Sequence, residues 1–144
     1  MERIWTLTMN YLSVALGGFI GAILRYEIGQ FFLPAVQEGG GFPWGTLMIN
    51  LTGCFALSLF LTLTLEFISV DPNIRLGVST GFLGAYTTFS TFALESIKLL
   101  QQTQYWDFGI YLFSSVFLGI AMSAFGLFTA RTLANYQRGK ASAS

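Results

Sequence analysis

The chain has 144 residues, of which 53% are hydrophobic and only 10% are charged, with seven basic and seven acidic side chains. Soluble domains usually carry about 25% charged residues, so this composition and a mean hydropathy of +0.63 exclude a soluble fold and predict a membrane protein. The chain has no histidine and one cysteine, Cys54. It therefore lacks the ligands of a transition-metal site and cannot form an internal disulfide.

Four long apolar runs make up almost the whole chain, at about residues 7–32, 44–67, 76–100 and 108–129. Each reaches the length of about 20 residues that a helix needs to cross a bilayer core. The connections are short and leave no room for a soluble or nucleotide-binding domain. We therefore expect an all-α membrane protein, with one four-helix transmembrane domain over residues 1–144. It should be a multi-pass protein of the cell inner (plasma) membrane, with the lipid bilayer and no nucleic acid as partner.

The first run, 7–32, carries Arg25 near its end. An arginine deep in a bilayer costs at least about 2.5 kcal/mol on insertion scales, but near a helix end it can reach the interface. An interfacial anchor is the commoner role, and a positive vestibule that concentrates anions is the alternative. Ser13, Gly17 and Gly21 form a face of small residues that predicts helix packing.

The second run, 44–67, places Thr46, Asn50 and Gly53 on one helical face. The amide of Asn50 must find hydrogen-bond partners inside a bilayer. One interpretation is a bond between helices, which contributes about 0.6 to 2 kcal/mol. The other is a donor that faces a permeating anion, and the sequence leaves both open.

The third run contains residues 81–92 (GFLGAYTTFSTF), where glycines, hydroxyl side chains and phenylalanines are crowded together. Irregular backbone and polar groups are tolerated at membrane depth only where protein buries them or where they line a cavity. The run therefore predicts a helix broken at mid-membrane, beside a polar path or an ion site. Glu95 is expected near an interface. No carboxylate lies near the middle of any run, which argues against proton-coupled transport.

The fourth run, 108–129, places Tyr111, Ser115, Gly119 and Ser123 at successive steps of four residues. Such a stripe is most often a packing seam for a neighbouring helix. It could equally line a narrow track with hydroxyl groups, and the spacing alone does not decide between the two.

The positive charges give little preference for one orientation in the membrane. Four crossings would place Arg3, Arg75, Arg131, Arg138 and Lys140 on one side, and Arg25 and Lys98 on the other. Arg138 and Lys140 belong to the C-terminal tail, so near the helix ends the count is three against two. This balance allows both insertions. Four short helices also cannot enclose much of a pore, so we expect an oligomer. A dimer of oppositely inserted copies satisfies both conditions and creates an inverted repeat.

Three stretches together resemble the signature motifs of the CrcB/Fluc fluoride ion channels. They are residues 17–26 (GGFIGAILRY), 45–53 (GTLMINLTG) and 81–92 with the following Glu95. They occur in the family's order and spacing and cover nearly the whole chain.

The resemblance implies a dual-topology antiparallel homodimer with two fluoride pores and passive export of cytoplasmic fluoride, which gives fluoride resistance. It implies a structural Na⁺ at the dimer centre, held by the backbone carbonyls of Gly84 and Thr87. It also implies roles for several side chains. The pore residues would be Asn50, Phe89, Phe92, Tyr111 and Ser115, and the vestibular residue would be Arg25. We add Thr46 to the expected pore residues because it shares the helical face of Asn50. Gly119 stands where some relatives have a serine.

Two other classes of protein remain as alternatives to a channel, and neither is an enzyme. A small dual-topology multidrug exporter also has four helices, but it needs a membrane-embedded carboxylate to couple protons, and none is found at mid-depth. A non-transporting structural membrane protein would explain the hydrophobicity but not the polar interruption of the third run.

Overall fold

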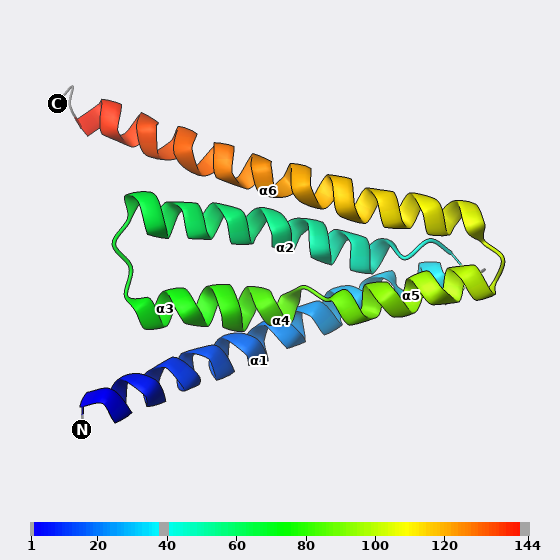
Figure 1. Cartoon of the computed structure of the whole chain (residues 1–144), viewed down its shortest axis with the longest axis horizontal. Coiled ribbons are helices and arrows are strands. Elements are labelled where there is room, and N and C mark those ends of the chain that lie inside the picture. Colours follow the sequence, from blue (N-terminus) through cyan, green and yellow to red (C-terminus); the bar gives the residue numbers. More distant parts are fainter. Residues whose placement is uncertain (1, 38–40, 142–144) are drawn as a thin grey trace.

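The computed structural model describes residues 2–37 and 41–141, and every regular element in these ranges is helical. The helices run roughly along the long axis of the molecule, and both termini lie at the same end (Figure 1). The elements, in chain order, are α1 (Glu2–Gln37), α2 (Trp44–Thr62), the π-helix η1 (Leu63–Phe67), α3 (Pro72–Leu76), the π-helix η2 (Gly77–Leu83), α4 (Gly84–Tyr86), α5 (Phe89–Gln101) and α6 (Tyr105–Ala141). The all-helical prediction is confirmed.

Three of the described helices are long and apolar enough to cross a membrane: Thr8–Phe32, Trp44–Phe67 and Tyr105–Arg138. The third predicted run is absent from this set because its helix is interrupted at Thr87 and Thr88. The helices α1 and α6 also extend beyond the predicted runs, whereas α2 and η1 together cover the predicted range 44–67. Hydropathy marks only the apolar part of a helix, whereas α6 continues for 37 residues through a polar last turn.

Local capping explains where the third segment begins. Asp71 is the N-cap of α3 and accepts a hydrogen bond from the backbone N–H of Asn73 at 2.8 Å, while Pro72 occupies the first helical position. Both residue types favour a helix start. The hydrogen bonds from Asn73 hold the pKa of the Asp71 carboxyl below its ordinary value.

Glycines let α1 and η2 approach closely. A Cβ atom added to Gly17 would collide with the carbonyl oxygen of Gly77, and one added to Gly21 would collide with that of Phe82. A Cβ on Gly77 would meet Ser13 in return. The predicted packing role of the small face on the first run is confirmed.

The helix α6 packs mainly against α2 and also contacts α5 and η1. The Ser58 hydroxyl donates to the carbonyl oxygen of Ser123 at 2.6 Å, and Arg131 forms an ion pair with Glu66 at 2.8 Å. A small buried core lies where α2, α5 and α6 meet. It contains Leu47, Leu99 and Tyr111, with Phe42, Leu51, Phe92 and Phe108 packed against it.

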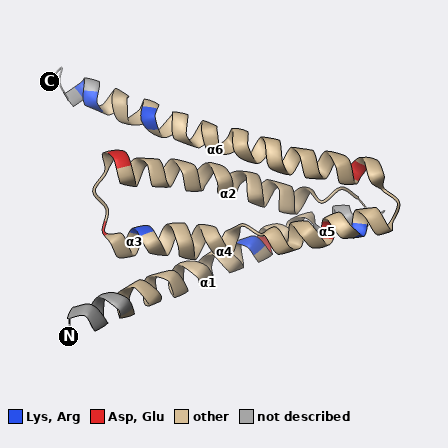
Figure 2. Cartoon of the chain, in the orientation of Figure 1, with Lys and Arg blue, Asp and Glu red and all other residues tan. Residues whose placement is uncertain are grey.

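Most large apolar side chains point outward, among them Phe19, Phe113 and Phe128. On α2 with η1 and on α6, the charged residues lie toward the helix ends, and the middle of each helix is tan (Figure 2). Charged residues also lie near the centre of the view, between the labels α4 and α5. An apolar belt between charged ends is the arrangement that a bilayer requires.

Candidate functional site

The interruption between α4 and α5 consists of two extended residues. Thr87 has ψ 156°, and Thr88 has φ −146° and ψ 122°. The N–H of Thr87 still bonds to the carbonyl of Leu83 at 3.1 Å, so α4 ends there in an ordinary helical turn. The backbone of Thr88 leaves the helix completely.

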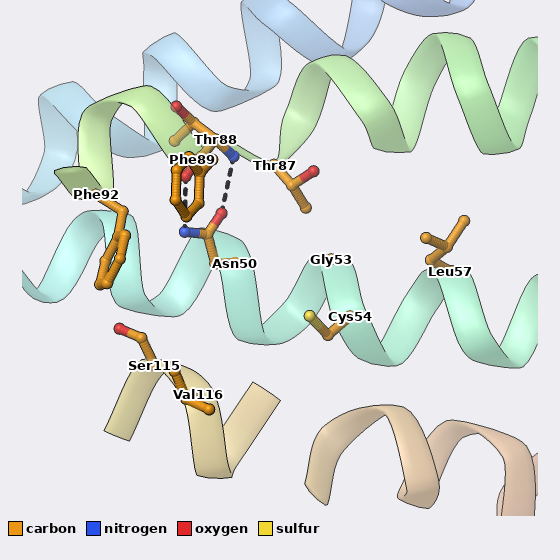
Figure 3. Close-up of a pocket in the computed structure, with 10 residues that line it drawn as sticks. All are labelled: Asn50, Gly53, Cys54, Leu57, Thr87, Thr88, Phe89, Phe92, Ser115 and Val116. Carbon is orange, nitrogen blue, oxygen red and sulfur yellow. Dashed lines mark hydrogen bonds between the residues drawn. The ribbon is translucent and has the colours of Figure 1, made fainter. Parts of the chain in front are cut away.

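The side chain of Asn50 pairs with this extended backbone. Its Nδ2 donates to the carbonyl oxygen of Thr88 at 3.0 Å, and its Oδ1 accepts from the Thr88 N–H at 2.8 Å (Figure 3). In a continuous helix the Thr88 N–H would instead bond to the carbonyl of Gly84. Asn50 therefore replaces the helical acceptor of the Thr88 N–H, and its two bonds fix the interruption to α2.

The hydroxyl of Thr88 caps α5. Its Oγ1 accepts from the N–H of Thr91 at 3.2 Å and donates to Thr91 Oγ1 at 2.9 Å. In a continuous helix the Thr91 N–H would bond to the carbonyl of Thr87. The two carbonyls expected to hold Na⁺, those of Gly84 and Thr87, have thus both lost their helical donors to the contacts of Thr88.

A pocket of about 320 Å³ lies beside the interruption. None of the described residues that line it is charged. They are Asn50, Gly53, Cys54, Leu57, Thr87, Thr88, Phe89, Phe92, Ser115 and Val116. We call this space the neutral pocket.

Two aromatic rings and two polar groups give the neutral pocket its chemistry. The rings of Phe89 and Phe92 are tilted by 44° with centroids 5.8 Å apart. Phe92 also packs on Tyr111, with centroids 5.1 Å apart, whereas Phe89 is 80% exposed. The Ser115 Oγ is buried and has no hydrogen-bond partner in the described part of the chain. Asn50 has a second N–H beyond the one given to Thr88.

A second pocket, of about 440 Å³, lies on the other side of Thr88. Its lining includes Arg25, Thr46, Thr88, Thr91 and Glu95. We call it the charged pocket, because Arg25 and Glu95 both face it.

The carboxylate of Glu95 accepts hydrogen bonds from two hydroxyl groups. Thr46 Oγ1 donates to Glu95 Oε1 at 2.9 Å, and the Tyr111 hydroxyl donates to Oε2 at 2.7 Å. Each carboxylate oxygen therefore has one donor, and neither hydroxyl proton is free while these bonds persist.

The residues singled out from the sequence divide between the two pockets. Asn50, Phe89, Phe92, Ser115 and Thr87 line the neutral pocket. Thr46 and Arg25 line the charged one.

Two expected site residues lie in neither lining. Tyr111 is fully buried in the core, and Gly84 is exposed beside the interruption. Of the stripe expected on the fourth run, the neutral pocket includes Ser115, while Gly119 has a buried backbone near Cys54.

Sequence reasoning did not identify Thr88, which lines both pockets, or Glu95 as the acceptor for Thr46 and Tyr111. A signal for Thr88 existed, since a threonine directly before an apolar run is a typical N-cap. The partners of Glu95 are 49 and 16 residues away in the chain, and no local pattern specifies such contacts.

Comparison with known proteins gives a consistent result. Residues 12–127 match the family model described as CrcB-like protein, Camphor Resistance (CrcB). A protein of Rhizobium etli (strain CIAT 652), named fluoride-specific ion channel FluC, is 44% identical over 121 residues, which is 84% of this chain and 95% of the relative. A Moorella thermoacetica protein, fluoride-specific ion channel FluC 1, is 45% identical over 85% of this chain and 86% of its own length. A Koribacter versatilis protein named FluC is 53% identical over 65% of this chain and 72% of its own. With a family model matched over most of its length and relatives this similar, the chain belongs to the CrcB family.

Proposed function

We propose that this protein is a fluoride-selective channel that gives passive export of cytoplasmic fluoride and thereby fluoride resistance. It is not an enzyme. The observation that carries the proposal is the neutral pocket, whose described lining offers weak donors and no charged group. The names of the relatives from Rhizobium etli and Moorella thermoacetica support the choice of ion.

Fluoride is small and strongly hydrated, so a selective pore must replace its water with several donors that still let the ion leave. The second N–H of Asn50, the free hydroxyl of Ser115 and the positive edges of Phe89 and Phe92 are donors of this kind. A lysine or arginine among them would hold the anion too tightly.

The charged pocket is proposed as the vestibule of the path. Arg25 raises the local concentration of anions there. Thr46 and Tyr111 are proposed as further pore hydroxyls, although both are bonded to Glu95 in the protomer. Each must turn away from Glu95 before it can donate to fluoride. Asn50 and Ser115 need no such rearrangement, because one N–H of Asn50 and the Ser115 hydroxyl can donate to an ion in the neutral pocket without leaving another partner.

The functional unit is proposed to be a dual-topology antiparallel homodimer with two pores, inserted in the cell inner membrane. Phe89 is the main support, because a pore-lining ring that is 80% exposed in one protomer needs a second copy to enclose the path. The balanced positive charges allow both insertions. The interruption at Thr87 and Thr88 would then lie at mid-membrane, facing the partner.

The dimer centre is proposed to hold one structural Na⁺. The carbonyls of Gly84 and Thr87, which have lost their helical donors to Asn50 and Thr88, are the oxygen ligands that a hard cation prefers. Such an ion would neutralise the released carbonyl dipoles and hold the two copies together.

Transport by purified protein in liposomes tests the function directly. Liposomes loaded with potassium fluoride should release fluoride only after valinomycin lets K⁺ leave, because a passive channel moves net charge. Liposomes loaded with potassium chloride should release little. Fluoride efflux that needs a proton gradient would favour the exporter alternative, and equal release of both anions would overturn selectivity.

A further inference from the structure

Thr88 stands at the wall between the two pockets. It is the residue that the linings of the neutral and the charged pocket share in the described part of the chain. It is only 6% exposed, while the next residue, Phe89, is 80% exposed. A buried threonine beside an exposed ring must have its polar atoms satisfied within the protein.

Its polar atoms are divided between two elements. The backbone N–H and carbonyl bind the amide of Asn50 on α2, at 2.8 and 3.0 Å. The hydroxyl binds Thr91 in the first turn of α5, through the backbone N–H at 3.2 Å and Oγ1 at 2.9 Å. The first turn of α5 also contains Phe89 and Phe92.

We infer that Thr88 is a positioning residue, which fixes the rings of Phe89 and Phe92 relative to the Asn50 amide. Its backbone is held by α2, and its side chain sets the direction in which α5 begins. Without the hydroxyl, the N–H of Thr91 loses its acceptor and the first turn of α5 can shift. The rings then no longer present their edges beside the second N–H of Asn50.

The effect of Thr88 on transport rests on the proposed function, but its effect on the position of the rings can be tested whether or not the protein conducts fluoride. Thr88→Val keeps the shape of the side chain and removes the oxygen, whereas Thr88→Ser keeps the cap. Thr132→Val is the matched control, since Thr132 is exposed on α6 and its hydroxyl donates only to the Phe128 carbonyl of its own helix, at 2.9 Å. Each variant is compared with the wild-type chain as an assembled protein in liposomes.

Two measurements distinguish positioning from simple helix stability. The first is fluoride efflux per assembled protein, which should fall about tenfold in Thr88→Val, because displaced rings would stabilise the anion less in the rate-limiting step, and stay within about threefold of wild type in Thr88→Ser. The second is the ¹⁹F NMR spectrum of protein that carries 4-fluorophenylalanine at position 89 or 92. The wild-type protein, Thr88→Ser and Thr132→Val should share one resonance, and Thr88→Val should show a shifted or split one.

The outcomes are separable. If Thr88→Val lowers only the yield of assembled protein, and the assembled fraction keeps the wild-type resonance and efflux, Thr88 is a structural cap and the inference is wrong. If the wild-type protein passes no fluoride, the proposed function fails, and the NMR comparison still decides whether Thr88 orients the rings.

Discussion

The side chain of Asn50 has the groups that both interpretations of its sequence position require. One N–H and the carbonyl oxygen bind the backbone of Thr88, which is the bond between helices. The remaining N–H is left to the neutral pocket, which Asn50 lines. The two interpretations are therefore compatible, because an amide has two N–H groups and a carboxylate or a hydroxyl does not.

This division predicts the effect of Asn50→Asp. One carboxylate oxygen can still accept from the Thr88 N–H, but the other would face the Thr88 carbonyl without a proton, and its charge would repel an anion. We expect fluoride efflux to fall at least about tenfold, which corresponds to about 1.4 kcal/mol in the rate-limiting step. The measurement is efflux per assembled protein. Asn135→Asp, an exposed change on α6, should conduct normally; wild-type efflux from assembled Asn50→Asp would remove Asn50 from the pore.

We propose that the positive edges of the Phe89 and Phe92 rings stabilise the anion, and Phe89 tests this idea more directly than Phe92. Its ring is 80% exposed in the protomer, so Phe89→Ile removes little packing within one chain but removes the positive ring edge. We expect fluoride efflux to fall at least about tenfold. Phe113→Ile, another exposed ring on α6, is the control and should have no such effect.

Phe92→Ile should lower fluoride efflux by a similar factor, but it should also destabilise the fold, because Phe92 packs against Tyr111. Efflux must therefore be compared with the amount of assembled protein. If both isoleucine variants assemble and conduct like wild type, the rings only pack, and Asn50 with the hydroxyl groups must carry the anion alone.

Single residues were predictable from the sequence where chemistry alone limits their options. One pocket is lined by Asn50, Ser115, Phe89 and Phe92. The sequence predicted this group from the helical spacing and from the interruption of the third run. Tyr111 differs. The spacing grouped it with Ser115, but a carboxylate on α5 bonds its hydroxyl and the core buries its ring, and both contacts depend on tertiary packing.

Between elements, Gly53 of α2 makes room for the interruption. A Cβ atom at this position would collide with Cγ2 of Thr87 and lie 3.4 Å from the Tyr86 ring. The hydroxyl of Tyr86 is in turn 2.8 Å from Thr52 Oγ1. The end of α4 thus lies close to α2 because Gly53 has no side chain, and the hydrogen bond between Tyr86 and Thr52 holds it there.

Gly53→Ala should therefore displace Thr87 from α2. Overpacking of this kind costs about 1 to 3 kcal/mol, and we expect a lower thermal stability of the assembled protein together with reduced fluoride efflux. Gly109→Ala on α6, where an added Cβ atom meets nothing within 4 Å, should change neither. An assembled Gly53→Ala protein with wild-type stability would mean that Thr87 can move freely.

The interruption itself was expected somewhere within residues 81–92, and the structure locates it at Thr87 and Thr88. The glycines of that stretch do not form the bend itself, since Gly81 lies within the π-helix η2 and Gly84 begins α4. Gly81 instead serves packing, because an added Cβ atom would meet Val14 of α1. The two π-helices have no signal in the hydrophobic pattern of the sequence. In the structure η2 packs against α1, and η1 contacts α2 and α6.

At the level of the whole molecule, orientation in the membrane can be measured with single cysteines. In a Cys54→Ser background, Ser69→Cys labels the exposed loop between η1 and α3, and Gln102→Cys labels the exposed end of α5. The connection between α2 and α3 and the connection between α5 and α6 lie at opposite ends of the bundle (Figure 1).

A dual-topology population should give about half labelling at each site with an impermeant thiol reagent in sealed vesicles, because the charge balance selects neither insertion. Full labelling should follow permeabilisation. Complete labelling of one site and none of the other would show a single orientation and exclude the antiparallel dimer.

The role of Na⁺ is the last property of the whole assembly that the interruption predicts. The freed carbonyls of Gly84 and Thr87 belong to the helix break, whereas the proposed fluoride path follows the neutral pocket with its uncharged donors. A cation held by fixed backbone oxygens has no reason to move with the anion, so Na⁺ should be structural and fluoride should move down its own electrochemical gradient.

Fluoride currents in planar bilayers should then reverse at the fluoride equilibrium potential, which shifts by about 59 mV for a tenfold fluoride gradient. A Na⁺ gradient imposed at equal fluoride should leave the reversal potential at zero. Reversal potentials that follow the Na⁺ gradient would instead demonstrate coupled transport, and the carbonyls at the interruption would then belong to a transport site.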